Sequence, residues 1–227
     1  MKKPVVDYRK LRLSNIKSPQ FNHLLLLWGW VGYFILYILT ENLIPAEKCY
    51  PVHSVLDDII PFCELFIIPY VGWYVLIVFS LLYFALYDID SFKNMQKFII
   101  ITQIVAMVVY IVFPTRQDLR PTEFERNNIL TQLTSLIYSA DTNTGVCPSL
   151  HVAYSLGIAS AWIKSKVASK KSKVFVTVFS FLVCISVAFV KQHSVVDIYA
   201  ALLLGVLAET IVYWKYYKNK SLKKVKI

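Results

Sequence analysis

The chain alternates long apolar runs with short polar segments, a pattern typical of a membrane protein. Three runs are long enough to cross about 30 Å of hydrocarbon as helices at about 1.5 Å per residue, at about 23–43, 65–86 and 98–114. Three shorter runs follow, at about 150–163, 174–190 and 195–214. The run at 150–163 is the weakest, because it is short and contains a histidine, so hydropathy alone allows a half-buried helix there.

Lysine and arginine positions decide whether the fourth run crosses. These residues concentrate on cytoplasmic segments of membrane proteins. With six crossings and both termini in the cytoplasm, 19 of the 24 lie inside, in 1–22, 87–97, 164–173 and 215–227. Five lie outside, namely Lys48, Arg116, Arg120, Arg126 and Lys191. The cluster at 164–173 would change sides without the fourth crossing, so the sequence predicts an all-α bundle of six transmembrane helices.

Composition supports the membrane class and narrows the partners. The chain is 57% hydrophobic and 17% charged, with a mean hydropathy of +0.54, outside the usual range of a soluble domain. A net charge of +10 raises the possibility of nucleic-acid binding. The surplus lies beside the predicted helix ends, however, where anionic lipid headgroups attract it. We therefore expect no nucleic-acid partner, and we expect the first run to remain as an anchor because no cleavage site follows it.

The short connections predict a single integral-membrane domain, 1–227. It has a basic cytoplasmic segment at 1–22, an extracytoplasmic loop at 115–149 and a basic cytoplasmic tail at 215–227. Apolar residues recur at helical spacing within the loop and predict an amphipathic helix at about 125–139. This helix either lies along the outer interface or packs as a lid, and the pattern does not choose between them.

The four cysteines, Cys49, Cys63, Cys147 and Cys184, show no metal-ligand spacing. Cys49 and Cys147 both fall on the predicted outer side, which permits a disulfide. Unpaired cysteines that pack as small apolar side chains are the favoured interpretation.

Polar residues from three outer segments reach the same predicted depth, where ionisable groups are costly unless they are paired or used. They are Arg116, Arg120, Ser149, His151, Lys191, His193 and Asp197. In a helix begun near His193, Asp197 lies one turn on and can fix the tautomer of the imidazole, which leaves the other ring nitrogen as a nucleophile. His151, from a neighbouring helix, is the candidate general acid.

The remaining residues suit an anion. Arg116 and Arg120 offer planar forks for phosphate, Lys191 adds a point charge, and Ser149 stands at a helix start, where phosphate binds readily. Such cations would stabilise a transferred phosphoryl group without a metal or other cofactor. Each residue alone is more often a headgroup contact, a packing histidine or a helix-start carboxylate. Their joint placement favours a site for phosphoryl transfer.

These residues resemble the type 2 phosphatidic acid phosphatase superfamily, which includes lipid phosphate phosphatases, vanadium haloperoxidases and fungal inositol phosphorylceramide synthase. Its pattern is Lys-x6-Arg-Pro, then Pro-Ser-Gly-His, then Ser-Arg-x5-His-x3-Asp. The matching residues here are Arg120 and Pro121, then Pro148 to His151, then Ser186, His193 and Asp197. The motifs cover roughly residues 110–205, and the six-span layout extends the resemblance over the chain. Phe113 and Val187 stand at the family's lysine and arginine positions, and Leu150 replaces the glycine, as in the inositol phosphorylceramide synthase branch.

The resemblance implies a six-helix bundle of the phosphatase and haloperoxidase type. It implies His193 as a nucleophile that forms a phosphohistidine, Asp197 orienting it, His151 as general acid, and Arg120 and Ser149 holding phosphate. Arg116 and Lys191 are added by proximity. The expected activity is metal-independent hydrolysis of a lipid phosphate, such as phosphatidic acid, at the outer face of a bacterial plasma membrane. Two alternatives stay open: a phosphotransferase that moves a phospho-headgroup between lipids, and a non-catalytic lipid-binding or transport protein.

A second His-x-x-x-Asp pair occurs at His53 and Asp57. It has no counterpart in the family pattern, and Pro61 lies only four residues beyond Asp57, which makes one continuous helix through the pair unlikely to form. Asp57, Asp58 and Glu64 could shape headgroup selectivity on this acidic outer segment. We expect coincidence instead, and we predict that the pair does no chemistry.

Overall fold

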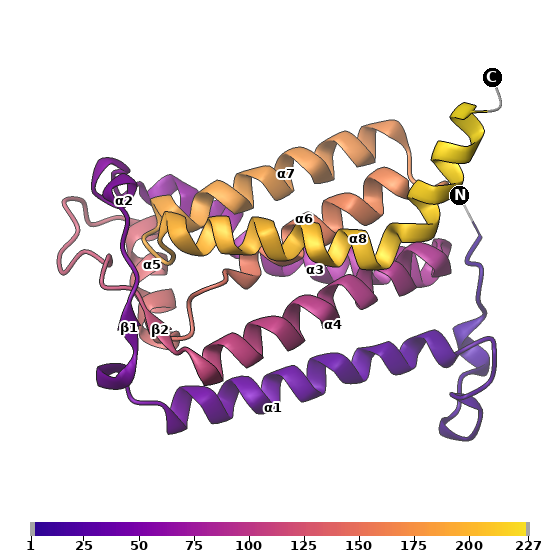
Figure 1. The fold of residues 1–227 in the computed structure, drawn as a ribbon, viewed down its shortest axis with the longest axis horizontal. Helices are drawn as coiled ribbons and strands as arrows, with labels where there is room; N and C mark the ends of the chain where they lie inside the picture. The colour runs from indigo at the N-terminus through magenta and orange to yellow at the C-terminus, as the bar shows by residue number, and fades with distance from the viewer. Residues whose placement is uncertain (1–2, 226–227) are drawn as a thin grey trace.

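A computed structural model describes residues 3–225, with side chains placed through Asn219, as a bundle of long helices (Figure 1). Residues 1–2 and 226–227, at the tips of the predicted basic segments, lie outside the described residues. The long helices are α1 (Trp28–Leu43, preceded by the 3-10 helix η3, Asn22–Leu27), α3 (Ile67–Tyr87), α4 (Ile89–Val112), α6 (Leu150–Lys164), α7 (Lys170–Phe189) and α8 (Val195–Val225).

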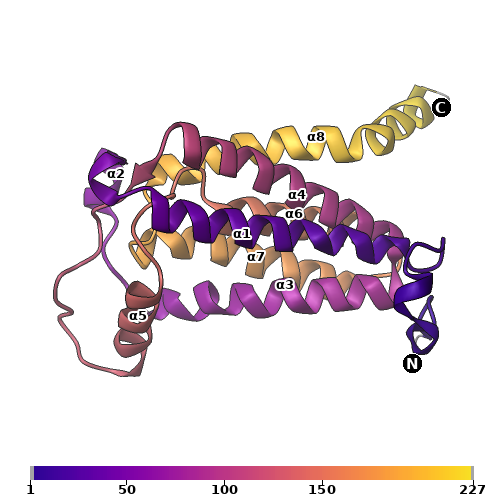
Figure 2. The ribbon, with the colours of Figure 1, turned by 90° about the horizontal axis from the view of Figure 1, so that it is seen from below.

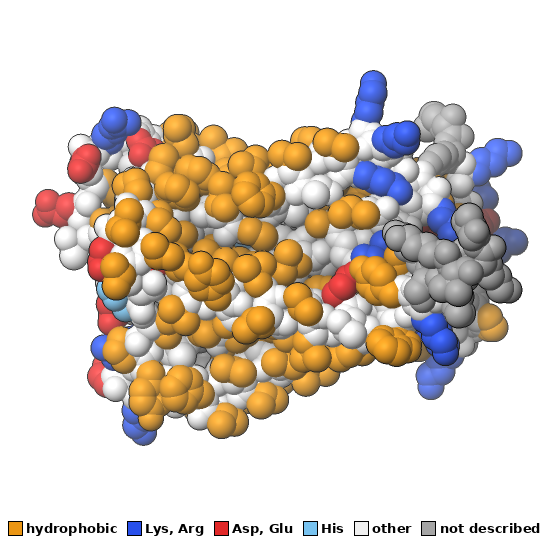
Figure 3. Space-filling view, turned by 45° about the horizontal axis from the view of Figure 1, so that its top comes forward, with side chains coloured by type: hydrophobic (Ala, Val, Ile, Leu, Met, Phe, Trp, Pro, Cys, Tyr) orange, Lys and Arg blue, Asp and Glu red, His pale blue; other side chains and the backbone are white. Residues whose placement is uncertain are grey.

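Five helical segments are long and apolar enough to cross a membrane. Within residues 3–225 they are Asn22–Leu43, Glu64–Tyr87, Ile89–Val112, Lys170–Phe189 and Val195–Asn219. Figure 3 shows hydrophobic side chains over the middle of the molecule and charged side chains at its two ends. Many apolar side chains in this middle zone are exposed, such as Val75 at 69% and Leu203 at 74%. These features define an all-α integral membrane protein, as the hydropathy predicts.

Helix α6 occupies the interior of the bundle and is only 15 residues long. It packs against α4, α7 and α8, and most of its side chains are buried. At Gly157 an added Cβ would lie 2.5 Å from Cδ1 of Phe98, so glycine permits this close approach to α4. Because protein surrounds α6, it does not need the continuous apolar surface of a lipid-facing helix. This explains why the fourth run is the weakest in hydropathy.

The third predicted run, 98–114, begins too late. Helix α4 starts at Ile89, directly after Asp88, so residues 89–97, which hydropathy left between the second and third runs, are helical. The Asp88 carboxylate caps α4 by accepting hydrogen bonds from the amide (3.1 Å) and hydroxyl (2.8 Å) of Ser91. Lys93 and Lys97 lower the hydropathy of this segment without lowering its helix propensity.

The far end of α8 also differs from expectation. The helix continues through the predicted tail to Val225, with a break at Tyr213, where φ is −107° and ψ is 16°. Figures 1 and 2 place the end of α8 and the N-terminal 3-10 helices η1 (Tyr8–Lys10) and η2 (Leu13–Asn15) at the same end of the bundle.

Short elements cover the opposite end. The connection from α1 to α3 contains η4 (Ala46–Lys48), β1 (Tyr50–Pro51), α2 (Val55–Ile59) and η5 (Glu64–Phe66). Strand β1 pairs in parallel with β2 (Thr115–Arg116), with Tyr50 opposite Thr115. This two-stranded pair fastens the α1–α3 connection to the segment 115–149.

Helix α5 (Ile129–Ala140) corresponds to the helix predicted at 125–139. It lies at the end of α3 (Figure 2) and contacts α3 and η5. Leu130, Leu133 and Ile137 pack against the core, as the lid interpretation describes, while Ile129 and Leu136 remain exposed. All four cysteines are free, so Cys49 and Cys147 form no disulfide.

Candidate active site

The turn between α7 and α8 carries His193. The backbone reverses at Lys191, whose φ of 53° lies in the left-handed region. The amides of Gln192 and His193 both donate to the carbonyl of Val187, at 2.9 and 3.1 Å. Ser194 then begins α8, and its hydroxyl accepts from the amide two residues on at 3.2 Å. The imidazole is therefore fixed by a tight, hydrogen-bonded turn.

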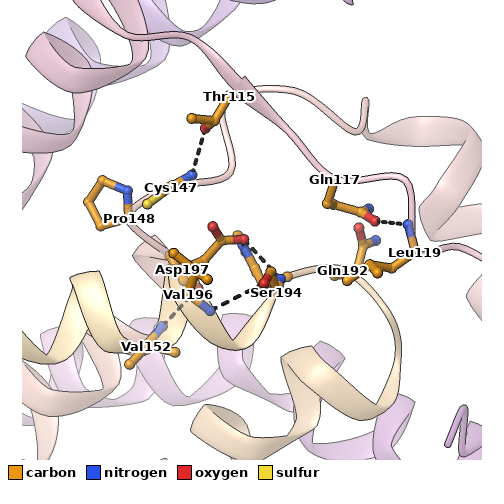
Figure 4. A network of polar contacts seen from close by, with 12 residues as sticks. Thr115, Gln117, Leu119, Cys147, Pro148, Val152, Gln192, Ser194, Val196 and Asp197 are labelled. Atoms are coloured by element: carbon orange, nitrogen blue, oxygen red, sulfur yellow. Dashed lines mark hydrogen bonds and ion pairs between the residues drawn. The ribbon is translucent and has the colours of Figure 1, made fainter. Parts of the chain in front are cut away.

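Asp197 is the third residue of α8, four residues beyond His193, and it is fully buried. Its Oδ2 lies 3.3 Å from Nδ1 of His193 and accepts from the Ser194 amide at 3.0 Å. Figure 4 shows this carboxylate directed toward Ser194. The predicted contact between the carboxylate and the imidazole is thus present, although His193 lies in the turn two residues before α8 and not within the helix, as the sequence analysis expected. The contact leaves Nε2 of His193 available to another partner.

His151, the second residue of α6, lies across from His193. The two imidazole centroids are 5.7 Å apart, with the ring planes at 63°. The His151 ring also packs against Tyr70, at 4.5 Å, and Trp73, at 4.1 Å. Its Nε2 is buried and has no hydrogen-bond partner within the described chain. A buried imidazole nitrogen without a partner is costly, which is a feature of sites that accept a ligand.

Ser149 caps α6 and is fully buried. Its hydroxyl oxygen accepts from the Val152 amide at 3.5 Å, and its own amide donates to the Asp197 carbonyl at 3.2 Å. This amide contact holds the start of α6 against the start of α8. The preceding Cys147 thiol lies beside the Asp197 carboxylate (Figure 4), and burial, together with that charge, raises the pKa of the thiol to about 12.

The two histidines face a cavity of about 600 Å³. Its walls come from the end of η3, from α1, α3, α4 and α6, from the end of α5 with the segment that follows it, and from the turn before α8. Aromatic side chains dominate these walls, among them Trp30, Tyr33, Tyr37, Trp73, Tyr74 and Tyr110. The aromatic cavity was not predicted, because its walls come from helices that are distant in the sequence.

Arg120 lies beside the site without lining the cavity. Its guanidinium donates to the carbonyls of Tyr138, Asp141 and Thr142 at 2.7–3.1 Å, and to Oε1 of Gln192 at 2.6 Å. It also lies 4.8 Å from the centroid of the Tyr138 ring. In this conformation Arg120 joins the segment after α5 to the turn that carries His193.

Arg116 and Lys191 point away from the cavity. Arg116 binds Asp118 and the carbonyls of Ala46 and Cys49. The ammonium of Lys191 donates to the carbonyls of Asp57 and Ile60 at 2.7 and 2.5 Å. Burial lowers the pKa of Lys191, and the nearby acidic side chains partly oppose this effect. The structure therefore brings His193, Asp197, His151 and Ser149 together, places Arg120 beside them, and directs Arg116 and Lys191 elsewhere.

Asp57 supports the site, a contribution that sequence reasoning missed. It is 3% exposed, and its carboxylate accepts from the Ser194 hydroxyl at 2.5 Å and the Val195 amide at 2.8 Å. A carboxylate at a helix N-terminus interacts favourably with the helix dipole and stabilises the helix. His53 pairs instead with the exposed Asp58, at 2.9 Å. Asp57 therefore caps α8 directly after His193, a structural role that the sequence did not indicate.

Gln192 is the other residue that the motifs did not indicate. It is 3% exposed, lines the cavity, and its Nε2 has no partner in the described part of the chain. A glutamine beside a motif histidine gives no distinctive sequence signal.

Comparisons of the chain with family models, with curated proteins and with solved structures return no match. The function is therefore inferred from the site geometry and from the motifs in the sequence.

Proposed function

We propose that this chain is a membrane-embedded phosphoryl-transfer enzyme of the type 2 phosphatidic acid phosphatase kind, acting on a lipid phosphate. The main support for this proposal is the arrangement of three side chains beside an aromatic cavity. The His193 ring contacts the Asp197 carboxylate, and the centroid of the His151 ring lies 5.7 Å from that of His193. This arrangement supplies a nucleophile, an orienting carboxylate and an acid at one place. The cavity supplies an apolar compartment for the rest of a lipid.

The leading reaction is hydrolysis of a phosphomonoester such as phosphatidic acid. Nε2 of His193 attacks phosphorus, the P–O bond to the lipid breaks, and His151 gives its proton to the departing oxygen. Water then attacks the phosphohistidine, the P–N bond breaks, and His151 takes a proton from the water. Asp197 stabilises the charge that develops on His193.

Phosphate binding in this scheme falls to Ser149 and Arg120. The Ser149 hydroxyl uses its oxygen for the helix cap, which leaves its hydrogen to donate. Arg120 would exchange one of its carbonyl partners for a phosphate oxygen. Arg116 and Lys191 have no part in this scheme, because their cationic groups are bound to the 46–60 segment.

The proposed topology has six crossings with both termini in the cytoplasm and the site on the extracytoplasmic side of a bacterial plasma membrane. The interior position of α6 and the concentration of lysine and arginine near the chain termini and at 164–173 support it. Cysteine accessibility tests it: a cysteine introduced at 122–125 should react with an impermeant reagent in intact cells, and one at 166–171 should not.

Activity is tested with purified protein in detergent, supplied with phosphatidic acid and a chelator. We expect phosphate release that survives the chelator and falls at least a thousandfold in His193→Ala and in His151→Ala. His53→Ala is the matched control and should keep its activity. Full release by His193→Ala would refute the proposed nucleophile, and no release by the wild type would favour transfer or a non-catalytic lipid-binding role.

A second reaction, transfer of a phospho-headgroup between lipids, is favoured by one observation. The described residues that line the cavity include Asp141 but neither lysine nor arginine, which is a poor setting for a dianionic monoester. Transfer predicts turnover that depends on an acceptor lipid and releases little free phosphate, so the two reactions separate in the same assay.

A further inference from the structure

The cavity changes character along its length. The lining residues run from Leu27, at the end of η3, along α1 to Tyr37, about 15 Å at the rise of a helix. On α3 they run from Trp73 and Tyr74 to Leu81, in the opposite direction. The end that holds Leu27 and Leu81 is therefore apolar. The other end holds the two histidines, and the shape suits an amphiphile with its phosphorus between them.

The end that holds the histidines is also acidic. Asp141 is the one formally charged lining residue among those described, histidines apart, and its Oδ1 accepts from the Tyr37 hydroxyl at 2.7 Å. Glu41 lies nearby and accepts hydrogen bonds from Thr142 and Thr144. Arg120 approaches from outside the lining and donates to the backbone of Asp141, not to its carboxylate. A group that carries positive charge is the ligand that this end favours.

Tyrosine side chains lie close to the same carboxylate. Tyr33, Tyr37 and Tyr74 all line the cavity and all lie close enough to interact electrostatically with Asp141. Aromatic rings attract ammonium groups through their negative faces, and several rings together form the sites that bind quaternary ammonium ligands. Tyrosine rings beside a carboxylate thus combine two attractions for one cation.

Gln192 supplies an independent indication of a ligand. Its side chain is 3% exposed, it lines the cavity next to His193, and its Nε2 has no partner among residues 3–225. A buried amide donor without an acceptor is costly. An oxygen of a phosphate held between the two imidazoles would accept from it.

We propose that this end of the cavity binds the ammonium headgroup of a zwitterionic phospholipid, of the ethanolamine or choline type, with Asp141 and the tyrosines as its receptor. The proposal rests on the proposed function in placing phosphorus at His193. In the corresponding reaction, His193 forms a P–N bond, the P–O bond to the diacylglycerol breaks, and His151 protonates that oxygen. An acceptor hydroxyl then attacks phosphorus, the P–N bond breaks, and the hydroxyl proton returns to His151.

Binding of short-chain lipids tests the headgroup directly. The full-length protein at pH 7.5 is titrated with dihexanoyl phosphatidylcholine, phosphatidylethanolamine, phosphatidylglycerol and phosphatidic acid, and fluorescence of the cavity tryptophans Trp30 and Trp73 is followed. We expect the choline or the ethanolamine lipid to bind at least tenfold more tightly than phosphatidic acid and phosphatidylglycerol. The proposal would be overturned if phosphatidic acid or phosphatidylglycerol, whose headgroup is a polyol, bound as tightly as the choline and ethanolamine lipids or more tightly. It would also be overturned if no lipid bound.

Variants separate the headgroup receptor from the chemistry. Asp141→Asn should weaken binding of the zwitterionic lipid about tenfold and leave phosphatidic acid unchanged or tighter. Glu123→Gln, an exposed acid of the same loop, should change neither. Tyr74→Leu should reduce the same preference severalfold, which keeps the test valid if Asp141→Asn does not fold. Retained preference in both variants would contradict the proposal.

His193→Ala distinguishes this proposal from the proposed function. It should retain the headgroup preference while phosphoryl transfer is lost. Continued transfer in that variant would overturn the catalytic scheme alone, whereas a missing headgroup preference in the wild type would overturn only the headgroup receptor.

Discussion

Asp57 holds the turn that carries His193, and its removal should loosen that turn. In Asp57→Ala, the Ser194 hydroxyl and the Val195 amide both lose their acceptor. Both groups are buried, and an unsatisfied buried polar group costs about 1–3 kcal/mol. Removal of the carboxylate also relieves its own desolvation, so we expect a net loss of about 2–4 kcal/mol in the free energy of unfolding.

The loss is measurable as thermal stability and as local protection. For a chain of this size, about 1 kcal/mol corresponds to roughly 2–4 °C, so the midpoint in detergent should fall by about 10 °C. Amide exchange should accelerate in residues 194–198 and at Ser54, because Asp57 accepts from the amides of both Val195 and Ser54. Asp57→Asn should recover part of the stability, since one oxygen remains to accept from the Val195 amide.

Asp58→Asn is the matched control, because Asp58 is the neighbouring acid with a side chain 66% exposed. Its pair with the half-exposed His53 is a surface ion pair, so Asp58→Asn and His53→Ala should both leave stability within about 0.5 kcal/mol. An unchanged midpoint in Asp57→Ala, or an equal loss in Asp58→Asn, would refute the capping argument.

Three further outcomes follow from packing and electrostatics. Gly157→Ala should lower the thermal midpoint, at a cost of about 1–3 kcal/mol, because the new Cβ meets the Phe98 ring at 2.5 Å; an unchanged midpoint would mean that this contact relaxes freely. Arg120→Lys should increase proteolysis of the 115–149 segment, since an ammonium cannot reach all four acceptors of the guanidinium. With a pKa of about 12, the Cys147 thiol should react slowly with maleimide at pH 7, and the rate in a variant with no other cysteine should rise about tenfold per pH unit up to pH 10; a plateau near pH 9 would contradict the raised pKa.

Hydropathy and charge in the sequence were sufficient for most of the fold. The apolar runs at 23–43 and 65–86 match helical segments within one or two residues, because lipid-facing helices need continuous apolar surface. The run at 98–114 misplaced the start of α4, because polar residues at a helix end change hydropathy without ending the helix. The buried α6 was the weakest of the predicted spans. Its neighbours are protein and not lipid, so it needs no continuous apolar surface and its hydropathy is low.

At the site, the sequence alone indicated that His193 and Asp197 meet near the start of a helix. His193 and Asp197 meet because Asp197, in the first turn of α8, accepts from the Ser194 amide and so directs its carboxylate toward the preceding residue, His193. The spacing could not show where long cationic side chains point, because many acceptors lie within reach of an arginine or a lysine. Tertiary packing decided that Lys191 binds the carbonyls of Asp57 and Ile60.

The second His-x-x-x-Asp pair shows the same division between local and long-range determinants. The sequence around His53 and Asp57 did not indicate which residues their side chains would contact in the folded protein. Only the approach of the α1–α3 connection to the start of α8 buried Asp57 and gave it the Ser194 and Val195 donors, 137 and 138 residues away. Local periodicity specifies helices and the contacts within a helical turn, whereas contacts across more than a hundred residues depend on how the helices pack.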